Sequence, residues 1–340
     1  MTTFTPPVVY GQRSCETDFR RACDSQQRHH SWLLYGPRGL GKTALAYKMA
    51  AFVLQTSPAS PAPPDTLPEL DPTQPTIKRI LAGSHHHFLA VTPTVGKGAK
   101  TASISIESIR QIHDFLNLTA LQGHTKVVVI DPFDAVVPAG GHALLKIIEE
   151  PPPHSLFILT AHSINTVPPT IRSRCRLQRL VPLSFDDFST FLKTQDLPTT
   201  INEQELYQLS GGVPGRALLW LNQQEETFVV PLQNILKNLT NSMPIPHDPL
   251  LRLATIIDKD ARADTSQNLW LLFWDRIFHW LHQHITTTPI HFHHPIFATW
   301  SRLLALYQRS ERLYLARGQT VISVFFHIHH ALAQGHNQKT

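Results

Sequence analysis

Cysteine and charged residues are both scarce in this sequence. Its 340 residues include only three cysteines, Cys15, Cys23 and Cys175, and no two of them form a CxxC pair. A disulfide framework needs more cysteines than this, so the composition fits a reducing compartment. Charged residues make up 16% of the chain and hydrophobic residues 42%. A disordered chain would have the opposite balance, so we expect a folded protein with a large core.

Long hydrophobic runs are also absent. The richest apolar stretch, residues 269–281, is interrupted by Asp275, Arg276 and His279 and is shorter than the roughly 20 apolar residues that a membrane span needs. The first residues, MTTFTPPVVYGQR, lack the charged-then-apolar pattern of a signal peptide. The net charge of +5 permits an acidic partner such as nucleic acid without requiring one. We therefore expect a soluble, cytoplasmic protein with no membrane partner.

Short apolar runs alternate with helical segments in the first half of the chain. The runs at 31–35 (SWLLY), 127–130 (VVVI) and 156–160 (LFILT) are typical of buried strands, and 42–55, 104–118 and 143–149 have helical composition or spacing. Strands alternating with helices predict an α/β fold with a parallel sheet. Residues 57–75 contain seven prolines, which predicts an extended surface loop.

The alternation ends near residue 182. Short helices are predicted for 183–223, and long apolar helices follow a break at 241–249. We therefore predict an α/β domain over 1–182, a small helical domain over 183–228 and an all-helical domain over 229–340.

One motif predicts a phosphate-binding loop. It matches GxxxxGK[ST] in full and comprises Gly36, Pro37, Arg38, Gly39, Leu40, Gly41, Lys42 and Thr43. A predicted strand precedes it and a predicted helix follows, so its backbone N–H groups and the helix dipole would face a phosphate. Lys42 would contact the β- and γ-phosphates and Thr43 would hold Mg²⁺. This pattern predicts ATP or ADP as ligand; the competing interpretation is a glycine-rich turn that binds nothing.

An acidic residue at the end of a second strand supports a nucleotide site. Asp131 follows the run 127–130 and is the candidate Mg²⁺ ligand. In many nucleotide hydrolases a glutamate comes next and polarises the attacking water, but here the next residue is Pro132. We therefore predict binding of a nucleotide with weak or absent hydrolysis. The alternative is that another carboxylate, such as Asp134, serves as the base.

Four segments together resemble a known family. They are GPRGLGKT (36–43), VVVID (127–131), ALLKIIEEPP (143–152) and PTIRSRC (169–175). In order and spacing they are similar to the bacterial replicative clamp loader subunits of the AAA+ class. The resemblance covers residues 8–220 and implies a P-loop NTPase domain with a parallel sheet and a small helical lid. It also implies a C-terminal helical collar that assembles subunits.

Within this family the sequence resembles the delta-prime branch more than the motor branch. Pro132 stands where the motor has its catalytic glutamate. The motor's polar sensor after the strand at 156–160 is replaced by Thr-Ala-His-Ser at 160–163. The lid arginine, Arg216, is one position later than in the motor pattern, which turns a helical side chain by about 100°.

The resemblance also implies a role for Arg174 and a set of partners. In the family, the arginine of the SRC motif projects across an interface to ATP on the neighbouring subunit, as an arginine finger. The implied partners are the gamma/tau motor subunits and the delta subunit and, through the complex, the sliding clamp and primer-template DNA. The competing interpretations are a salt-bridged surface arginine at 174, an ATP-hydrolysing motor subunit, and a helicase loader.

No zinc is predicted. Many family members carry a four-cysteine module between the phosphate-loop helix and the next strand, but residues 44–126 contain no cysteine. His85, His86 and His87 lie in this region, yet adjacent residues of a strand point to alternate faces, which disfavours a shared metal.

Overall fold

The computed structural model describes residues 8–337 except 25–28, 56–65, 96–101, 118–124, 196–201, 222–227, 242, 263–268, 288–292 and 314. The chain divides into two compact units. The first comprises Met1–Gln195 with Gly212–Gly215, and the second comprises Asp196–Gly211 with Arg216–Thr340. The predicted division into domains over 1–182, 183–228 and 229–340 stays a prediction.

A five-stranded sheet forms the centre of the first unit. Its strands pair in parallel in the order β2 (Phe88–Val91), β5 (Lys126–Ile130), β6 (Ser155–Ala161), β1 (Ser31–Tyr35) and β7 (Arg176–Arg179). All five residues of β5 are buried, as expected for a strand covered on both faces. The predicted α/β fold with a parallel sheet is confirmed.

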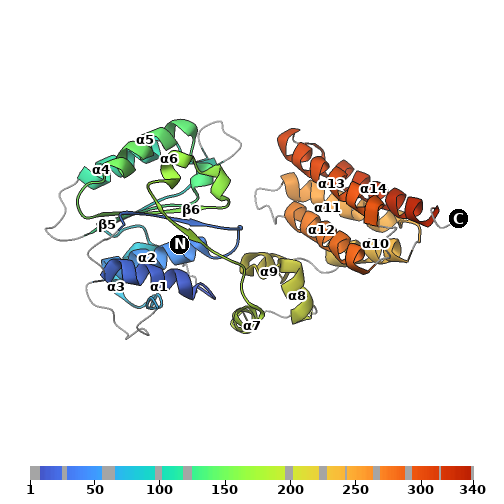
Figure 1. Ribbon diagram of the computed structural model, residues 1–340, viewed down its shortest axis with the longest axis horizontal. Coiled ribbons are helices and arrows are strands. Elements are labelled where there is room, and N and C mark those ends of the chain that lie inside the picture. Colours follow the sequence, from blue (N-terminus) through green and yellow to red (C-terminus); the bar gives the residue numbers. More distant parts are fainter. Residues whose placement is uncertain are drawn as a thin grey trace. The chain divides into compact units, whose positions relative to one another are not determined.

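Helices cover both faces of this sheet (Figure 1). Alternate strand residues point to opposite faces, so Trp32 and Leu34 pack in one core and Leu33 in the other. The core of Trp32 is closed by α1 (Arg13–Asp24), α2 (Lys42–Leu54) and α3 (Pro75–Leu81). The core of Leu33 is closed by α4 (Ile106–Asn117), α5 (Pro138–Glu149) and α6 (Pro169–Arg172).

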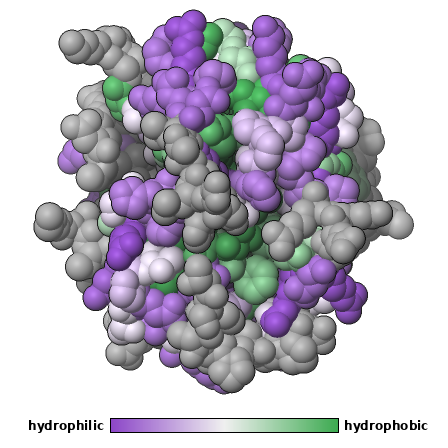
Figure 2. Space-filling view, turned by 90° about the vertical axis from the view of Figure 1, so that its left-hand side faces the viewer, coloured by the Kyte–Doolittle hydropathy of each residue, from purple (hydrophilic) through white to green (hydrophobic). Residues whose placement is uncertain are grey.

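Shorter elements complete the first unit. They are the antiparallel pair β3 (Thr94–Val95) and β4 (Ala102–Ser103), the 3-10 turns η1 (Phe133–Ala135) and η2 (Ile164–Thr166), and α7 (Phe185–Lys193). The predicted proline-rich loop lies partly outside the described residues. Its described part, residues 66–74, contains no helix or strand, and α3 begins at Pro75, where proline needs no intrahelical N–H partner. On the left-hand side of Figure 1 the surface is largely hydrophilic, with hydrophobic side chains gathered near its centre and top (Figure 2).

The second unit is helical in its described residues. It contains α8 (Glu203–Ser210), most of α9 (Pro214–Leu221), α10 (Val230–Thr240), α11 (His247–Arg262), α12 (Leu269–Thr287), α13 (His293–Leu313) and α14 (Arg317–Asn337). Aromatic rings fill its core: Trp274 packs against Trp270 and Tyr307, and Phe273 against Phe325. In the part of the chain that the structure describes, no helix combines the length and the apolarity that crossing a membrane requires.

Candidate functional site

The predicted phosphate loop follows β1 directly and leads into α2. Its backbone turns at Gly39 (φ 91°) and Gly41 (φ 80°), in the left-handed region that favours glycine. Gly36 is packed so tightly that a Cβ there would lie 2.6 Å from the carbonyl oxygen of Leu180. Because α2 begins at Lys42, its free N–H groups and the positive end of its dipole lie at the loop. The local structure is therefore that of an anion-binding loop.

Lys42 is folded back into this loop. Its side chain is buried, and Nζ donates hydrogen bonds to the carbonyl oxygens of Gly36 at 2.7 Å and Pro37 at 2.8 Å. Burial lowers the pKa of Lys42 from 10.5 to about 8, although the carboxylates of Asp131 and Asp134 act in the opposite direction. The remaining loop residues differ in exposure, with Leu40 buried and Arg38 exposed.

The structure brings Asp131 and Thr43 together, as the sequence predicts. Asp131 follows β5 at the carboxyl edge of the sheet, and its Oδ2 accepts a hydrogen bond from Thr43 Oγ1 at 2.7 Å. Its other oxygen, Oδ1, accepts a hydrogen bond from Thr160 Oγ1. The Asp131 carboxylate and the Thr43 hydroxyl are oxygen ligands of the kind that Mg²⁺ prefers. The residues present therefore fit the predicted ion.

Asp134, the alternative base, has both carboxylate oxygens engaged. Oδ2 accepts a hydrogen bond from the backbone N–H of His162 at 2.7 Å, and Oδ1 accepts one from Thr166 Oγ1 at 2.5 Å. Both donors belong to the segment that follows β6. Asp134 therefore holds this segment in place beside the loop, a structural role that competes with action as a base.

His162 belongs to the segment 160–163, which the sequence analysis places at the position of the family's polar sensor without giving the histidine itself a role. Strand β6 pairs with β1, and the Gly36 N–H donates to the carbonyl of Ala161, so His162 lies next to the phosphate loop. Its Nδ1 is buried, and no hydrogen-bond partner for it exists among the described residues. Burial lowers the pKa of His162, and the cations Lys42 and Arg38 lower it further against the opposing effect of Asp134 and Asp131. The sequence signal is its position just after the apolar run 156–160, whereas the pairing of β6 with β1 is visible only in the structure.

Arg174 lies at the amino-terminal edge of the sheet, opposite the carboxyl edge where Lys42 and Asp131 lie. It precedes β7, which runs parallel to β1 with Arg176 opposite Trp32, the second residue of β1. The phosphate loop follows the last residue of β1, so the sheet separates the two features. Arg174 Nη2 lies 2.6 Å from Glu149 Oε1, and both side chains are 38% exposed. The structure thus does not place Arg174 in the same site as Lys42.

Cys175, the next residue of the SRC motif, is buried between α6 and β7. Burial raises the pKa of its thiol to about 12. A thiol with so high a pKa is unreactive at neutral pH, so Cys175 acts as a small core residue beside the exposed arginine.

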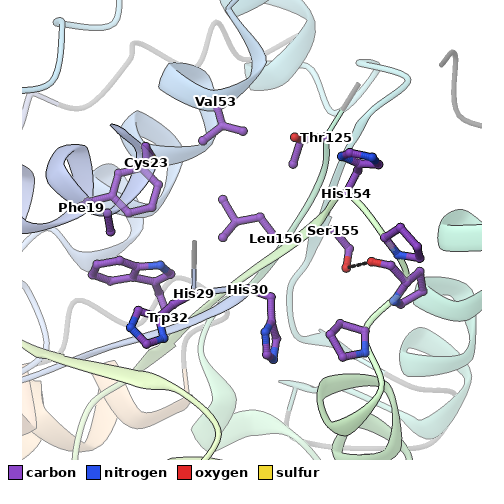
Figure 3. Close-up of a pocket in the computed structure, with 14 residues that line it drawn as sticks. Phe19, Cys23, His29, His30, Trp32, Val53, Thr125, His154, Ser155 and Leu156 are labelled. Atoms are coloured by element: carbon purple, nitrogen blue, oxygen red, sulfur yellow. Dashed lines mark hydrogen bonds between the residues drawn. The ribbon is translucent and has the colours of Figure 1, made fainter. Parts of the chain in front are cut away.

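A cavity of about 340 Å³ lies at the amino-terminal edge of the sheet. Figure 3 shows residues that line it. It is lined by Phe19 and Cys23 of α1, by Trp32, and by residues around the starts of β1, β5 and β6. Ser155 Oγ donates to the carbonyl oxygen of Pro152 at 2.6 Å in its wall. None of the residues predicted to bind a nucleotide lines this cavity, and the sequence analysis did not anticipate it.

Arg216, which the sequence analysis assigns to a predicted lid, has a partner in the second unit. Arg216 Nε lies 3.4 Å from Asp275 Oδ2 of α12, and burial raises the pKa of Asp275 to about 6 although Arg216 acts against the rise. Just before Arg216 in the sequence, Gly215 packs on the phosphate loop, and its N–H donates to the carbonyl oxygen of Gly39 at 2.9 Å.

Within the described residues, no group of three or more His, Cys, Asp or Glu side chains is arranged to hold a metal ion.

The strand order, the loop and the Asp131–Thr43 pair define an α/β domain of the P-loop type. A family model described as "DNA polymerase III, delta subunit" matches residues 11–184. The chain therefore belongs to the DNA polymerase III delta-subunit family.

Individual relatives of the chain include named subunits of DNA polymerase III. The chain is 34% identical over 190 residues to the DNA polymerase III subunit delta' of Pseudomonas aeruginosa. The aligned segment covers 55% of this chain and 54% of the relative. The chain is 31% identical over 240 residues to the DNA polymerase III subunit gamma of Buchnera aphidicola, covering 69% of this chain and 62% of the relative. The matches thus span less than two thirds of these relatives' own lengths. Among solved structures, a gamma subunit-related protein of Thermotoga maritima aligns with 94% of this chain and 99% of its own, at 16% identity and a TM-score of 0.47.

Proposed function

We propose that the chain is a delta-prime-type scaffold subunit of a DNA polymerase III clamp loader, which loads the sliding clamp onto primed DNA during replication. The observation that carries this proposal is the combination of an intact phosphate loop with Pro132 after Asp131 and with a solvent-accessible arginine in the SRC motif. The similarity to delta' subunits supports it. The proposed partners are the gamma/tau motor subunits and the delta subunit in the bacterial cytoplasm, with the helical region over 229–340 as the collar that assembles them.

The phosphate loop would hold ATP or ADP with Mg²⁺. The backbone N–H groups of residues 36–43 would surround the phosphates, Lys42 would leave its two carbonyl partners for a phosphate oxygen, and Thr43 and Asp131 would hold the ion. When bound, Mg²⁺ would neutralise part of the phosphate charge. Pro132 offers no basic atom, and the oxygens of Asp134 are engaged by the segment after β6. We infer that nucleotide stays bound and is hydrolysed slowly or not at all.

Arg174 would act on a neighbouring subunit's nucleotide. Its guanidinium is accessible and lies at the sheet edge opposite the chain's own phosphate loop, which is the placement that a finger supplied in trans requires. A guanidinium that stabilises the charge on a transferring phosphoryl group contributes about 10³–10⁵ in rate. Supplied in trans, it makes hydrolysis depend on correct assembly.

ATP binding and turnover by the purified chain separate a scaffold from a motor. We expect binding without turnover in the wild type, and no binding in Lys42→Ala. Because a motor would assemble with itself, the measurement is repeated at high protein concentration. Turnover that Lys42→Ala abolishes would replace the scaffold proposal by a motor subunit.

The finger role is tested in the complex reconstituted with motor and delta subunits from the same organism. Arg174→Ala should reduce clamp-stimulated ATP hydrolysis and clamp loading while leaving the chain folded, as judged by circular dichroism. Arg172→Ala, which removes a cation two residues earlier, is the matched control and should leave both rates unchanged. Unimpaired loading with Arg174→Ala would remove the finger role.

A further inference from the structure

Glu149 and Arg174 come from two different motifs and meet on the surface of the first unit. Arg174 Nη2 lies 2.6 Å from Glu149 Oε1, a length typical of a charge-assisted hydrogen bond. Its Nη1 donates to the carbonyl oxygen of Thr170 at 3.0 Å and to Ser173 Oγ at 3.2 Å. Three contacts from its own chain therefore hold the guanidinium.

Both backbones that carry this pair are fixed. Glu149 is the last residue of α5, the preceding Ile148 carbonyl oxygen lies 3.2 Å from His30 Nε2, and three prolines follow at 151–153. On the other side, the Arg174 N–H donates to the carbonyl oxygen of Ile171, and Cys175 is buried. A side-chain pair built on two rigid segments has a defined geometry, whereas a free arginine samples many rotamers.

The position of Glu149 calls for a cation. A carboxylate at the carboxyl end of a helix faces the negative end of the helix dipole, which is unfavourable unless a positive group lies nearby. Arg174 supplies that group. The neighbouring Glu150 directly follows α5, is exposed, and has no ion-pair partner among the described residues. The pairing is therefore specific to the first of the two adjacent glutamates.

The hydrogen-bond capacity of Arg174 is only partly used. A guanidinium has five N–H donors, and three contacts to the described residues occupy part of them. The remaining donors are available to an acceptor outside the chain, such as a phosphate oxygen. Partial restraint of this kind removes rotamer freedom before assembly and keeps donors for the ligand.

We propose that Glu149 is a positioning residue for Arg174, holding its guanidinium ready for the terminal phosphates of a nucleoside triphosphate bound by the neighbouring subunit. This inference rests on the proposed function, in which Arg174 acts in trans. Glu149 itself touches no phosphate; it acts through the arginine. Its removal should therefore slow the neighbour's hydrolysis without weakening the neighbour's nucleotide binding.

The test uses the reconstituted complex and measures kcat and KM for ATP hydrolysis. The relevant rate is the part of turnover that Arg174→Ala abolishes. Glu149→Gln keeps the side chain's shape and removes its charge; we expect about a two- to fivefold loss of this part of kcat, the scale of a partly exposed ion pair, with KM unchanged. Glu150→Gln removes the adjacent charge and is the matched control, which should leave kcat and KM unchanged.

A double-mutant cycle separates positioning from a general structural effect. In the Arg174→Ala background, Glu149→Gln should not change the remaining kcat, because a positioning residue then has nothing left to position. If Glu149→Gln lowered kcat by the same factor with Arg174 present and with Arg174→Ala, its role would be structural, and the inference would be overturned. Circular dichroism and thermal unfolding of the isolated variants verify that each folds.

The remaining outcomes distinguish the inference from the proposed function beneath it. If Arg174→Ala leaves hydrolysis unchanged, the finger role itself is wrong. If Arg174→Ala slows hydrolysis and Glu149→Gln does not, the finger role stands and Glu149 has no part in it. A rate increase in Glu149→Gln would show that the glutamate restrains the arginine away from the neighbour's nucleotide, which also overturns the proposal.

Discussion

Nucleotide affinity should fall between pH 7 and pH 9, because the pKa of Lys42 lies within this interval. Burial lowers the pKa of Lys42 from 10.5 to about 8 in the nucleotide-free loop. Phosphate binding needs the ammonium form, and a bound phosphate would raise the pKa again by opposite charge. Loss of the proton from the free chain therefore competes with nucleotide binding.

The magnitude follows from the fraction of chains that carry a charged Lys42. With a pKa of about 8, this fraction is about nine tenths at pH 7 and about one tenth at pH 9. An apparent dissociation constant rises in inverse proportion to the competent fraction. We therefore expect about tenfold weaker binding at pH 9, or about 1.4 kcal/mol.

Isothermal titration with ADP at constant free Mg²⁺ measures this slope. The last pKa of a phosphate group is about 6, so the charge of this ligand is nearly constant over the interval. Circular dichroism at each pH verifies that the chain stays folded. A dissociation constant that is the same at pH 7 and pH 9 would refute the reasoning, because Lys42 would then be either solvated or absent from the phosphate contact.

Two further predictions concern Gly215 and Asp275. Gly215→Ala places a Cβ 2.6 Å from the Gly39 Cα, so we expect about 1–3 kcal/mol of destabilisation in chemical denaturation and weaker nucleotide binding in titration. The control is Gly141→Ala, whose Cβ meets only an ordinary contact. It should change neither the stability nor the nucleotide affinity. The pKa of Asp275 is raised from 3.8 to about 6, so its protonation favours the folded state: the stabilisation is complete below about pH 4 and is lost as the pH rises through about 6. Thermal unfolding should therefore show the wild type gaining stability over Asp275→Asn as the pH falls from 7 to 4, by an amount on the order of 2 kcal/mol; a pH-independent difference would contradict the assignment.

The central strands could be predicted from the sequence because they are buried on both faces. A strand of this kind is read as a continuous apolar run, and the predicted runs 31–35 and 127–130 correspond to β1 and to β5, Lys126–Ile130. Strand β7, with the sequence RLQR, was not predicted. It lies at the sheet edge and only partly buries its side chains, so its sequence carries no apolar signal.

The candidate site divides in the same way. The phosphate loop is contiguous, so one motif places all of it, and Asp131 could be added because it ends an apolar strand. The parts that were missed depend on pairing between distant segments. His162 lies beside the loop only because β6 pairs with β1, and Glu149 meets Arg174 only because α5 ends where it does, next to α6. Neither contact has a spacing rule that a single sequence displays.

A parallel sheet separates the two proposed activities physically. Residues that follow the strands gather at its carboxyl edge, where Lys42 and Asp131 lie, and residues that precede them gather at the amino edge, where Glu149 and Arg174 lie. Among the described residues, no hydrogen bond or ion pair joins one group to the other. In the proposed function, a change at one edge, such as Pro132 in the place of a base, would therefore alter hydrolysis of the chain's own nucleotide without moving the arginine. Sheet topology thus explains how a chain can lose its own hydrolysis and keep the residue that supports hydrolysis in a neighbour.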